Sequence, residues 1–364
     1  MIFWISNLYN YKSLKNNDTF SPAATEWQTE FIKAINKYSK QKILIINYNY
    51  SKFWPFGKIY IKRNLFNLKK IKSFSFDYIN LPFFKNINIR KKIKEKIIEI
   101  KGHDKKIIFT YNFDKISISL AKELKLNNNF KWISIVADFD GKERKKIEKK
   151  LNKADLVIYL SDYAFNKSNL KSKILVQGGI DKIEITKFKK TQSFLYAGSL
   201  GPWIDIEKFI SDFLKFDKDK IKLFITSNDK KYFKSKLNIN NKKIKFLGFK
   251  NKKDFNKLSK KIDVFVNLRD ENNHDNNNNF PSKILHYLRY CKPIISTDQL
   301  SYTKELRKIL LLKKRNGKYE ELIRKAIKFN KKLLLKKQKQ SKKIIKEHYN
   351  WNKIIKNLLI KISD

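Results

Sequence analysis

Hydrophobic positions along the chain form short unbroken apolar runs that alternate with segments of helical periodicity. Trp27, Phe31, Ala34 and Ile35 recur three or four residues apart, which is typical of an amphipathic helix. The first half is expected to contain strands near 1–5, 42–46, 73–76, 107–110, 132–136 and 156–160, and helices near 22–38, 86–101, 114–125 and 142–152. Because strands buried on both faces of a parallel sheet are continuously apolar, this alternation predicts an α/β domain with helices covering a parallel sheet.

The alternation restarts after a polar segment, 182–191, which we interpret as a linker. Expected elements of the second half are strands near 194–197, 222–225, 244–247, 264–267 and 294–297, a helix near 203–215, a basic helical region over 300–345 and a last amphipathic helix. The sequence therefore predicts a domain over 1–185, a second domain over 192–345 and a terminal helix over 346–364.

One stretch of the second half combines a helix start with a cation. Pro281 suits the first turn of a helix, where its missing N–H costs nothing, and Ser282 and Lys283 follow it. The helix is expected to end at Lys292-Pro293, before the apolar strand 294–297. A helix that begins at the carboxyl edge of a parallel sheet presents free N–H groups, so this stretch predicts a phosphate-binding site.

Composition adds a strong positive charge to this picture. The chain of 364 residues is 41% hydrophobic and 14% aromatic, which is enough for true cores, and its formal net charge is +49. Lys, Asn and Ile abound together, as A·T-rich coding produces, yet the surplus still creates a positive field that attracts anionic lipid, nucleic acid or phosphorylated substrates. The single cysteine, Cys291, excludes an internal disulfide and suits a reducing cytosol, and we find no apolar run long enough to span a bilayer.

Several motifs occur together in order: Phe194-Leu195-Tyr196-Ala197-Gly198-Ser199-Leu200, Phe246-Leu247-Gly248-Phe249, Ile262-Asp263-Val264-Phe265-Val266, Phe280-Pro281-Ser282-Lys283-Ile284-Leu285, Lys292-Pro293-Ile294-Ile295-Ser296-Thr297 and Asn350-Trp351. In this order and spacing they resemble the nucleotide-sugar half of bacterial retaining glycosyltransferases of the GT-B fold, most closely the family-four group that makes cell-surface polysaccharide. The resemblance covers 193–298 and the last helix, while the first half matches in pattern only. It implies two Rossmann-like domains whose parallel sheets face a cleft, with the C-terminal helix packing back on the N-terminal domain.

The resemblance also implies which residues bind the donor. Gly198 and Ser199 would approach the diphosphate, and the turn 280–283, with Phe280, Pro281, Ser282 and Lys283, would meet phosphate or donor sugar. The glycine loop lacks the family's usual basic residue, and Lys283 and Arg269 are the expected substitutes.

The family's pair of glutamates, eight positions apart, falls here on Asn278 and His286. Neither residue is acidic, although an amide or a neutral imidazole can still hydrogen-bond sugar hydroxyls. Glu271 is the candidate that could replace the missing acid.

Candidate acceptor-side residues lie in or near the first half. Ser21 opens the first helix and Asp138 follows a strand, while Gly178 and Gly179 end the last strand region. Each has a plainer interpretation, as an N-cap, a loop acid or a turn. Asp138 with Asp140 also fits the D-x-D metal motif of other glycosyltransferases, but the resemblance implies no obligatory metal and no other cofactor.

The function that the resemblance implies is transfer of a sugar from a nucleotide-sugar donor to a lipid-linked glycan acceptor, in synthesis of surface polysaccharide, lipopolysaccharide or capsule. A non-catalytic GT-B subunit and a nucleic-acid-binding protein are the alternatives, although no specific nucleic-acid signature supports the latter. The expected location is the cytoplasm. The basic helix 86–101 leaves open attachment to the anionic inner face of the cell membrane, against a solvated face on a core helix.

Overall fold

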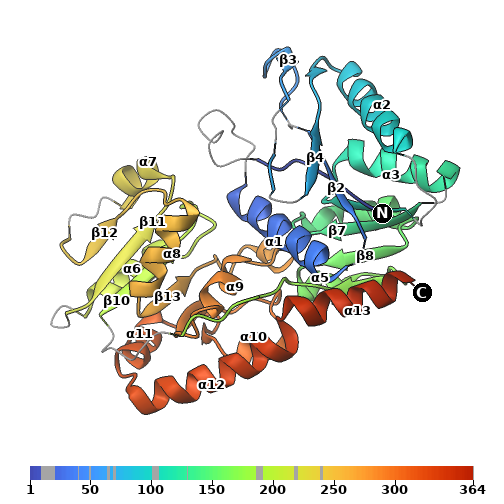
Figure 1. The fold of residues 1–364 in the computed structure, drawn as a ribbon. Coiled ribbons are helices and arrows are strands. Elements are labelled where there is room, and N and C mark those ends of the chain that lie inside the picture. Colours follow the sequence, from blue (N-terminus) through green and yellow to red (C-terminus); the bar gives the residue numbers. More distant parts are fainter. Residues whose placement is uncertain are drawn as a thin grey trace. The chain divides into compact units, whose positions relative to one another are not determined.

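The chain divides into two compact units, each built around one parallel sheet (Figure 1). The computed structural model describes residues 1–9, 21–39, 41–48, 51–63, 66–68, 71–100, 106–128, 130–185, 192–216, 220–237 and 241–363. The first unit comprises 1–178 together with 351–364, and the second comprises 179–350.

The first unit contains these elements: β1 (Ile2–Ser6), α1 (Pro22–Tyr38), β2 (Ile43–Asn47), β3 (Tyr60–Ile61), β4 (Lys72–Ser75), β5 (Tyr78–Ile79), α2 (Phe84–Glu99), β6 (Ile107–Tyr111), α3 (Lys115–Asn128), β7 (Lys131–Val136), the 3₁₀ turn η2 (Gly141–Glu143), α4 (Arg144–Leu151), β8 (Leu156–Tyr159), α5 (Asp162–Lys167), β9 (Lys173–Leu175) and α13 (Trp351–Ser363). Its sheet has the order β4-β2-β1-β6-β7-β8-β9, with every pairing parallel.

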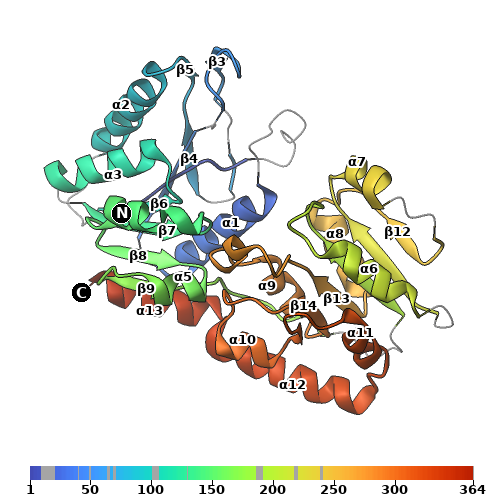
Figure 2. The ribbon, with the colours of Figure 1, turned by 180° about the vertical axis from the view of Figure 1, so that it is seen from behind.

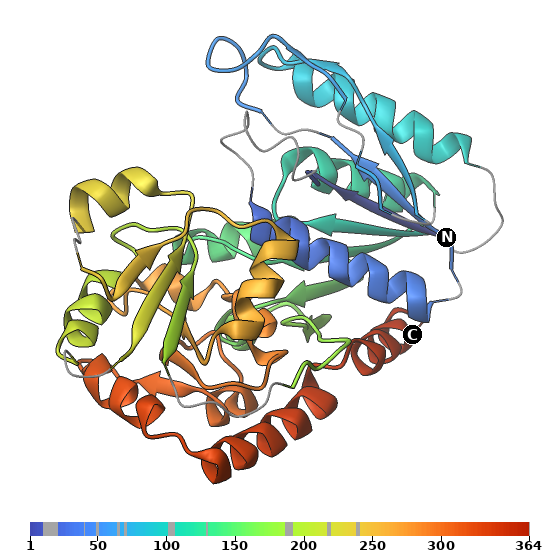
Figure 3. The same ribbon diagram turned by 60° about the vertical axis from the view of Figure 1, so that its left-hand side comes forward.

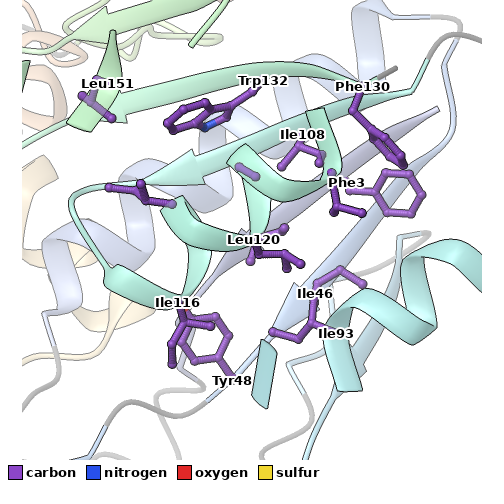
Figure 4. Close-up of a cluster of buried hydrophobic side chains, with 14 of the residues drawn as sticks. Phe3, Ile46, Tyr48, Ile93, Ile108, Ile116, Leu120, Phe130, Trp132 and Leu151 are labelled. Carbon is purple, nitrogen blue, oxygen red and sulfur yellow. The ribbon is translucent and has the colours of Figure 1, made fainter. Parts of the chain in front are cut away.

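The two faces of this sheet have separate cores. Alternate strand residues, such as Phe3 and Ile108, point into a cluster that includes α2, α3 and α4 (Figure 4). On the other face Trp4 stacks on Phe109, with ring centroids 5.3 Å apart, against α1. Parallel strands buried on both faces account for the unbroken apolar runs in the sequence.

The last helix, α13, belongs to the first unit, as the sequence predicted. Trp351 packs edge-on against Phe31 of α1, with ring centroids 5.6 Å apart. Lys131 Nζ donates a 2.5 Å hydrogen bond to the Ile362 carbonyl. Helices α1 and α13 therefore cover the same part of the first unit, as Figure 2 shows from behind.

The second unit contains β10 (Ser193–Ala197), α6 (Ile206–Leu214), β11 (Lys222–Thr226), α7 (Lys230–Tyr232), the π-helical turn η3 (Phe233–Leu237), β12 (Ile244–Phe246), α8 (Lys252–Lys261), β13 (Val264–Asn267), the 3₁₀ turn η4 (His274–Asn277), α9 (Lys283–Leu288), β14 (Ile294–Thr297), α10 (Lys304–Lys308), β15 (Leu311–Lys313), α11 (Tyr319–Ile327) and α12 (Lys331–His348). Its parallel sheet has the order β12-β11-β10-β13-β14-β15. Helices α6 and α11 pack together over one face, and Tyr287 of α9 stacks on Phe265 of the other, with ring centroids 4.5 Å apart.

Some predicted elements differ from the observed ones. The region predicted as helical over 300–345 also contains the strand β15, and helix α9 begins at Lys283, so Pro281 lies just before it. The antiparallel pair β3–β5 and the pair α5–β9 were not predicted. These elements have three residues or fewer per strand, too few to show a period-2 pattern.

The structure shows contacts for the predicted linker and for the basic helix whose solvent face or membrane attachment the sequence left open. Glu184 N donates to the Arg289 carbonyl, so the start of 182–191 packs on the second unit, while 186–191 lie outside the described residues. In α2 the isoleucines Ile89, Ile93 and Ile97 are fully buried in the core. The basic side chains of α2 therefore occupy the solvent side of a core helix. Within the described residues, no helix has the length and apolar character needed to cross a membrane.

Candidate functional site

The candidate donor site lies at the carboxyl edge of the sheet in the second unit. Strands β10, β11 and β12 are added in one direction, and β13 then returns to the opposite side of β10. The loops after β10 and β13 therefore leave neighbouring strands at a topological switch point, where open α/β sheets bind ligands.

Two side chains that sequence analysis missed, Tyr196 and Asp229, hydrogen-bond the glycine loop after β10. Tyr196 Oη donates to the Ser199 carbonyl at 2.7 Å, and Asp229 Oδ2 accepts from Leu200 N at 2.6 Å. Burial raises the pKa of Tyr196, so its hydroxyl stays protonated. Asp229 also accepts a hydrogen bond from Ser227 Oγ. The sequence pattern Ser-x-Asp directly after β11, at the same edge of the sheet, could have indicated this residue.

Lys283 reaches the glycine loop from the start of α9. Its Nζ donates to the Ala197 carbonyl at 2.9 Å. A Cβ at Gly198 would lie 3.2 Å from this Nζ and 2.8 Å from Tyr196 Oη, so only glycine fits beside the ammonium without displacing a neighbour. The structure thus brings together Gly198 and Lys283, which lie far apart in the sequence.

Arg269 follows β13 at the neighbouring position of the edge. Its backbone N–H donates to Thr297 Oγ1 at 3.1 Å, and its Nη1 donates to Asn276 Oδ1 at 3.3 Å. Strands β10 and β13 pair in parallel, so Arg269 and the glycine loop follow them at the same edge of the sheet. Arg269 and Lys283, the two cations that the sequence predicted, therefore both lie at the carboxyl edge of this sheet.

The turn before α9 is mostly buried. Phe280 packs edge-on to Tyr302, with ring centroids 6.4 Å apart, and the Pro281 carbonyl accepts from Ile284 N at 3.0 Å. Ser282 is half-buried, precedes α9 in αR geometry and makes no side-chain cap bond. Because α9 has only six residues, its dipole is short and the Lys283 ammonium is the stronger anion-binding group.

Asn278 is 4% exposed, and its Oδ1 accepts no hydrogen bond from the described residues. A buried amide oxygen without a donor costs free energy. A sugar hydroxyl would satisfy it, which fits the donor-sugar role predicted for this position.

His286 points to the neighbouring helix α8. Its Nε2 lies 3.3 Å from Ser259 Oγ, and its ring packs on Phe255 with centroids 4.7 Å apart. Burial is the largest cause that lowers the pKa of His286 to about 3, and the positive charges of Arg289, Lys252 and Lys283 contribute to the same shift. The imidazole is therefore neutral near pH 7 and cannot act there as a general acid.

Replacing His286 with glutamine should remove part of the acid sensitivity of the fold. The unfolded chain binds a proton at His286 below about pH 6.5 and the folded chain does not, so stability falls as pH drops from 6.5 toward 3. Between pH 7 and pH 5 we expect wild type to lose about 1 to 2 kcal/mol more unfolding free energy than His286→Gln, measured by urea titration. Equal losses in the two proteins would contradict the neutral, buried assignment.

Glu271 is held in a buried ionic network. Its carboxylate accepts from Lys313 Nζ at 2.7 Å and from Asn316 N at 3.2 Å, and Lys313 also lies 3.7 Å from Asp205. Burial would raise the pKa of Glu271, but the hydrogen bonds from Lys313 and Asn316 outweigh it and lower the pKa. Tyr319 Oη completes the network by donating to Asp205 at 2.9 Å. The carboxylate is thus ionised and bound within the unit, and its catalytic role stays a prediction.

The predicted acceptor-side residues have local roles in the structure. Ser21 caps α1 by accepting from Ala24 N at 3.2 Å, and Asp138 is exposed after β7. Gly178 has φ 127°, a conformation that side chains rarely adopt, while Gly179 is half-buried. Acceptor contact by these residues stays a prediction.

The second acid of the D-x-D motif has a local role in the structure. Asp140 caps the turn η2 by accepting from Lys142 N at 2.8 Å. Across the described residues, no group of three or more His, Cys, Asp and Glu side chains could hold a metal ion.

Residues 180–351 match the family described as "Glycosyl transferases group 1", and these residues nearly coincide with the second unit. No curated protein matches the chain by sequence.

Solved structures match over nearly the whole chain. A glycosyltransferase from Rickettsia africae is 12% identical, with TM-score 0.68, covering 99% of this chain and 97% of that one. A lipopolysaccharide outer core galactosyltransferase in its apo form is 16% identical, with TM-score 0.62 and coverage of 99% and 98%. The catalytic domain of starch synthase IV from Arabidopsis thaliana, bound to ADP and acarbose, is 8% identical, with TM-score 0.64 and coverage of 100% and 98%. The protein therefore has the GT-B fold, as its sequence predicted, and its second unit is similar to the glycosyl transferases group 1 family over residues 180–351.

Proposed function

We propose that this protein is a glycosyltransferase that binds the diphosphate of a nucleotide sugar at the edge formed by Gly198, Arg269 and Lys283. The observation that supports this most is the Lys283 ammonium, 2.9 Å from the Ala197 carbonyl and beside a glycine that leaves no room for a Cβ. A close backbone approach combined with a cation suits a diphosphate. The starch synthase of the same fold carries ADP, which agrees with a nucleoside diphosphate as the shared part of the donor.

The chemical demand at this site is to stabilise a leaving diphosphate. As the bond between the anomeric carbon and the diphosphate oxygen breaks, the negative charge on the diphosphate grows. Fixed cations and N–H dipoles at the site, with Lys283 and Arg269 as the cations, would lower the energy of that transition state. Asn278 would hydrogen-bond a hydroxyl of the donor sugar. In this proposal the acceptor is a lipid-linked glycan of surface polysaccharide synthesis, the anomeric configuration is retained, and the location is cytoplasmic.

A second candidate function is that of a GT-B subunit that binds a nucleotide and assists a partner transferase. It is favoured because none of the three residues considered for the acidic role carries a free carboxylate. Asn278 cannot ionise, His286 is neutral with a pKa lowered to about 3, and the Glu271 carboxylate is bound by Lys313.

One experiment separates the two candidates. The protein is screened by thermal shift against nucleoside diphosphates, and then incubated with the matching nucleotide sugars while release of nucleoside diphosphate is measured. Stabilisation with release supports the transferase, and stabilisation without release supports the non-catalytic subunit. A protein that no nucleotide stabilises at saturating concentration would contradict both.

A further inference from the structure

Exposed aromatic and aliphatic side chains gather in one part of the first unit. Half of the eighteen large hydrophobic side chains that are exposed in the described residues lie between positions 53 and 87. We call this set the aromatic face, and its members are Phe53, Trp54, Phe56, Ile59, Tyr60, Ile79, Phe83, Phe84 and Ile87. Scattered exposed hydrophobic residues need no explanation, but a concentration of this kind marks an interaction surface.

Hydrogen bonds join the two sequence segments of the aromatic face. Strands β3 and β5 pair antiparallel, with Tyr60 directly opposite Ile79, so these two exposed side chains share one face. Trp54 N donates to the Asn80 carbonyl at 3.0 Å, and Asn80 N donates to the Ile59 carbonyl at 2.7 Å. Figure 3 shows this strand pair and the start of α2 at the same end of the first unit.

The loop that presents the aromatic residues is fixed from inside. Asn80 is fully buried, and its Nδ2 donates to the carbonyls of Lys52 and Lys58 at 2.6 and 2.8 Å. Lys85 Nζ donates to the Ser51 carbonyl at 2.5 Å. The exposed rings therefore project from an ordered support.

Phe83 adds an independent observation. Its φ is 66°, a region that bulky residues rarely adopt, and its side chain is 88% exposed, immediately before α2. Strained backbone persists where the surrounding structure imposes it, and it concentrates at functional positions. A ring exposed in this way is not stabilised by burial in the hydrophobic core.

Positive charge surrounds the aromatic face. Residues 51–91 contain ten lysines and arginines but one acidic residue, Asp77, and Asp77 accepts from Arg63 N at 2.5 Å. Exposed Lys52, Lys58 and Lys62 flank the aromatic residues along the chain. Such a surface repels a second copy of this basic chain and attracts an anionic surface.

We propose that the aromatic face is a membrane-docking surface that inserts its rings into the interface of a bilayer rich in anionic lipid. Aromatic side chains favour the headgroup level of a bilayer, and neighbouring lysines gain energy from anionic lipids. The apolar stripe of α2 does not take part, because Ile89, Ile93 and Ile97 are buried in the core. This inference does not depend on the proposed donor site.

Sedimentation with vesicles tests the proposal. Because the whole chain is strongly basic, binding is compared at about 0.5 M salt, where the Debye length is roughly 4 Å and attraction over longer distances is screened. With vesicles of phosphatidylcholine and phosphatidylglycerol we expect wild type to stay bound and Phe53→Ser/Phe56→Ser/Phe84→Ser to bind at least tenfold less. The control Leu333→Ser/Leu335→Ser/Ile360→Ser replaces exposed apolar residues elsewhere and should bind like wild type. Equal binding by both triple variants would overturn the proposal.

Tryptophan fluorescence locates the contact. Trp54 and Trp203 are 49% and 43% exposed, and the other four tryptophans are buried. Brominated lipid should quench wild type and Trp203→Phe, and the quenching should disappear in Trp54→Phe. Quenching that survives in Trp54→Phe would place the contact elsewhere and contradict the assignment.

Phe83→Gly separates membrane binding from folding. Glycine adopts a positive φ without a Cβ clash, so this variant should resist urea about as well as wild type while its vesicle affinity falls. Unchanged affinity would count against the proposal. A different result would instead identify an interface between copies: wild type forms dimers and binds no vesicles, while the Phe53→Ser/Phe56→Ser/Phe84→Ser variant is monomeric.

Discussion

Replacing Lys283 with alanine is expected to weaken binding of a nucleoside diphosphate by about ten- to one hundredfold. The ammonium lies at the switch point of the sheet, 2.9 Å from the Ala197 carbonyl and beside Gly198. In the proposed complex, removing it would delete a charge-assisted hydrogen bond to phosphate, which is worth about 1.5 to 3 kcal/mol. Isothermal titration with the nucleoside diphosphate that gives the largest thermal shift measures the effect.

Lys222→Ala is the matched control for this variant. Lys222 is exposed at the first residue of β11, so it lies at the amino edge of the sheet, opposite to the candidate site. It removes the same charge from the same unit and should leave the affinity unchanged. Equal weakening by the two variants would show that only the overall positive field acts on the ligand, and it would refute the assignment of Lys283.

Replacing Lys313 with methionine should cost about 3 to 5 kcal/mol of unfolding free energy. Lys313 is 3% exposed and lies between two buried carboxylates, 2.7 Å from Glu271 and 3.7 Å from Asp205. Without the ammonium, Glu271 would remain buried with an uncompensated charge. Urea unfolding at pH 7, compared with wild type, gives the difference.

Two further variants identify the cause of this loss. Lys314→Met changes an exposed neighbour and should alter stability little, and Lys313→Met/Glu271→Gln should recover part of the loss. In wild type the lowered pKa of Glu271 gives stability that is present above the unfolded pKa, near 4.5, and is lost as pH falls through the folded pKa. A Lys313→Met protein as stable as wild type would contradict the buried network.

The architecture was largely accessible from the sequence because parallel strands buried on both faces leave a strong signal. The run Val264-Phe265-Val266 was predicted as a strand and is β13. The strand β15, with its three residues Leu311–Lys313, was missed because the surrounding sequence is basic and helical. Its partner in the buried network, Glu271, therefore looked like a free acid near the donor, since nothing in the local sequence showed that Lys313 would reach it.

The candidate site was predictable in part for a similar reason. A glycine after a strand and a lysine at a helix start have local signatures, so Gly198 and Lys283 could be chosen from the sequence. The hydrogen bonds of Tyr196 and Asp229 to the glycine loop arise only when β10 and β11 lie side by side. The contact of His286 with Ser259 likewise needs α8 and α9 to be packed together. Sequence patterns report the burial of one element more directly than the contacts between two.

Hydrogen–deuterium exchange with and without a saturating nucleoside diphosphate tests the central claim most directly. If the carboxyl edge of the second sheet binds the diphosphate, the amides of 197–201 and 282–285 should gain protection while the amino ends of the same strands stay unchanged. Bound nucleotide that protects neither segment, or protects only segments of the first unit, would contradict the account.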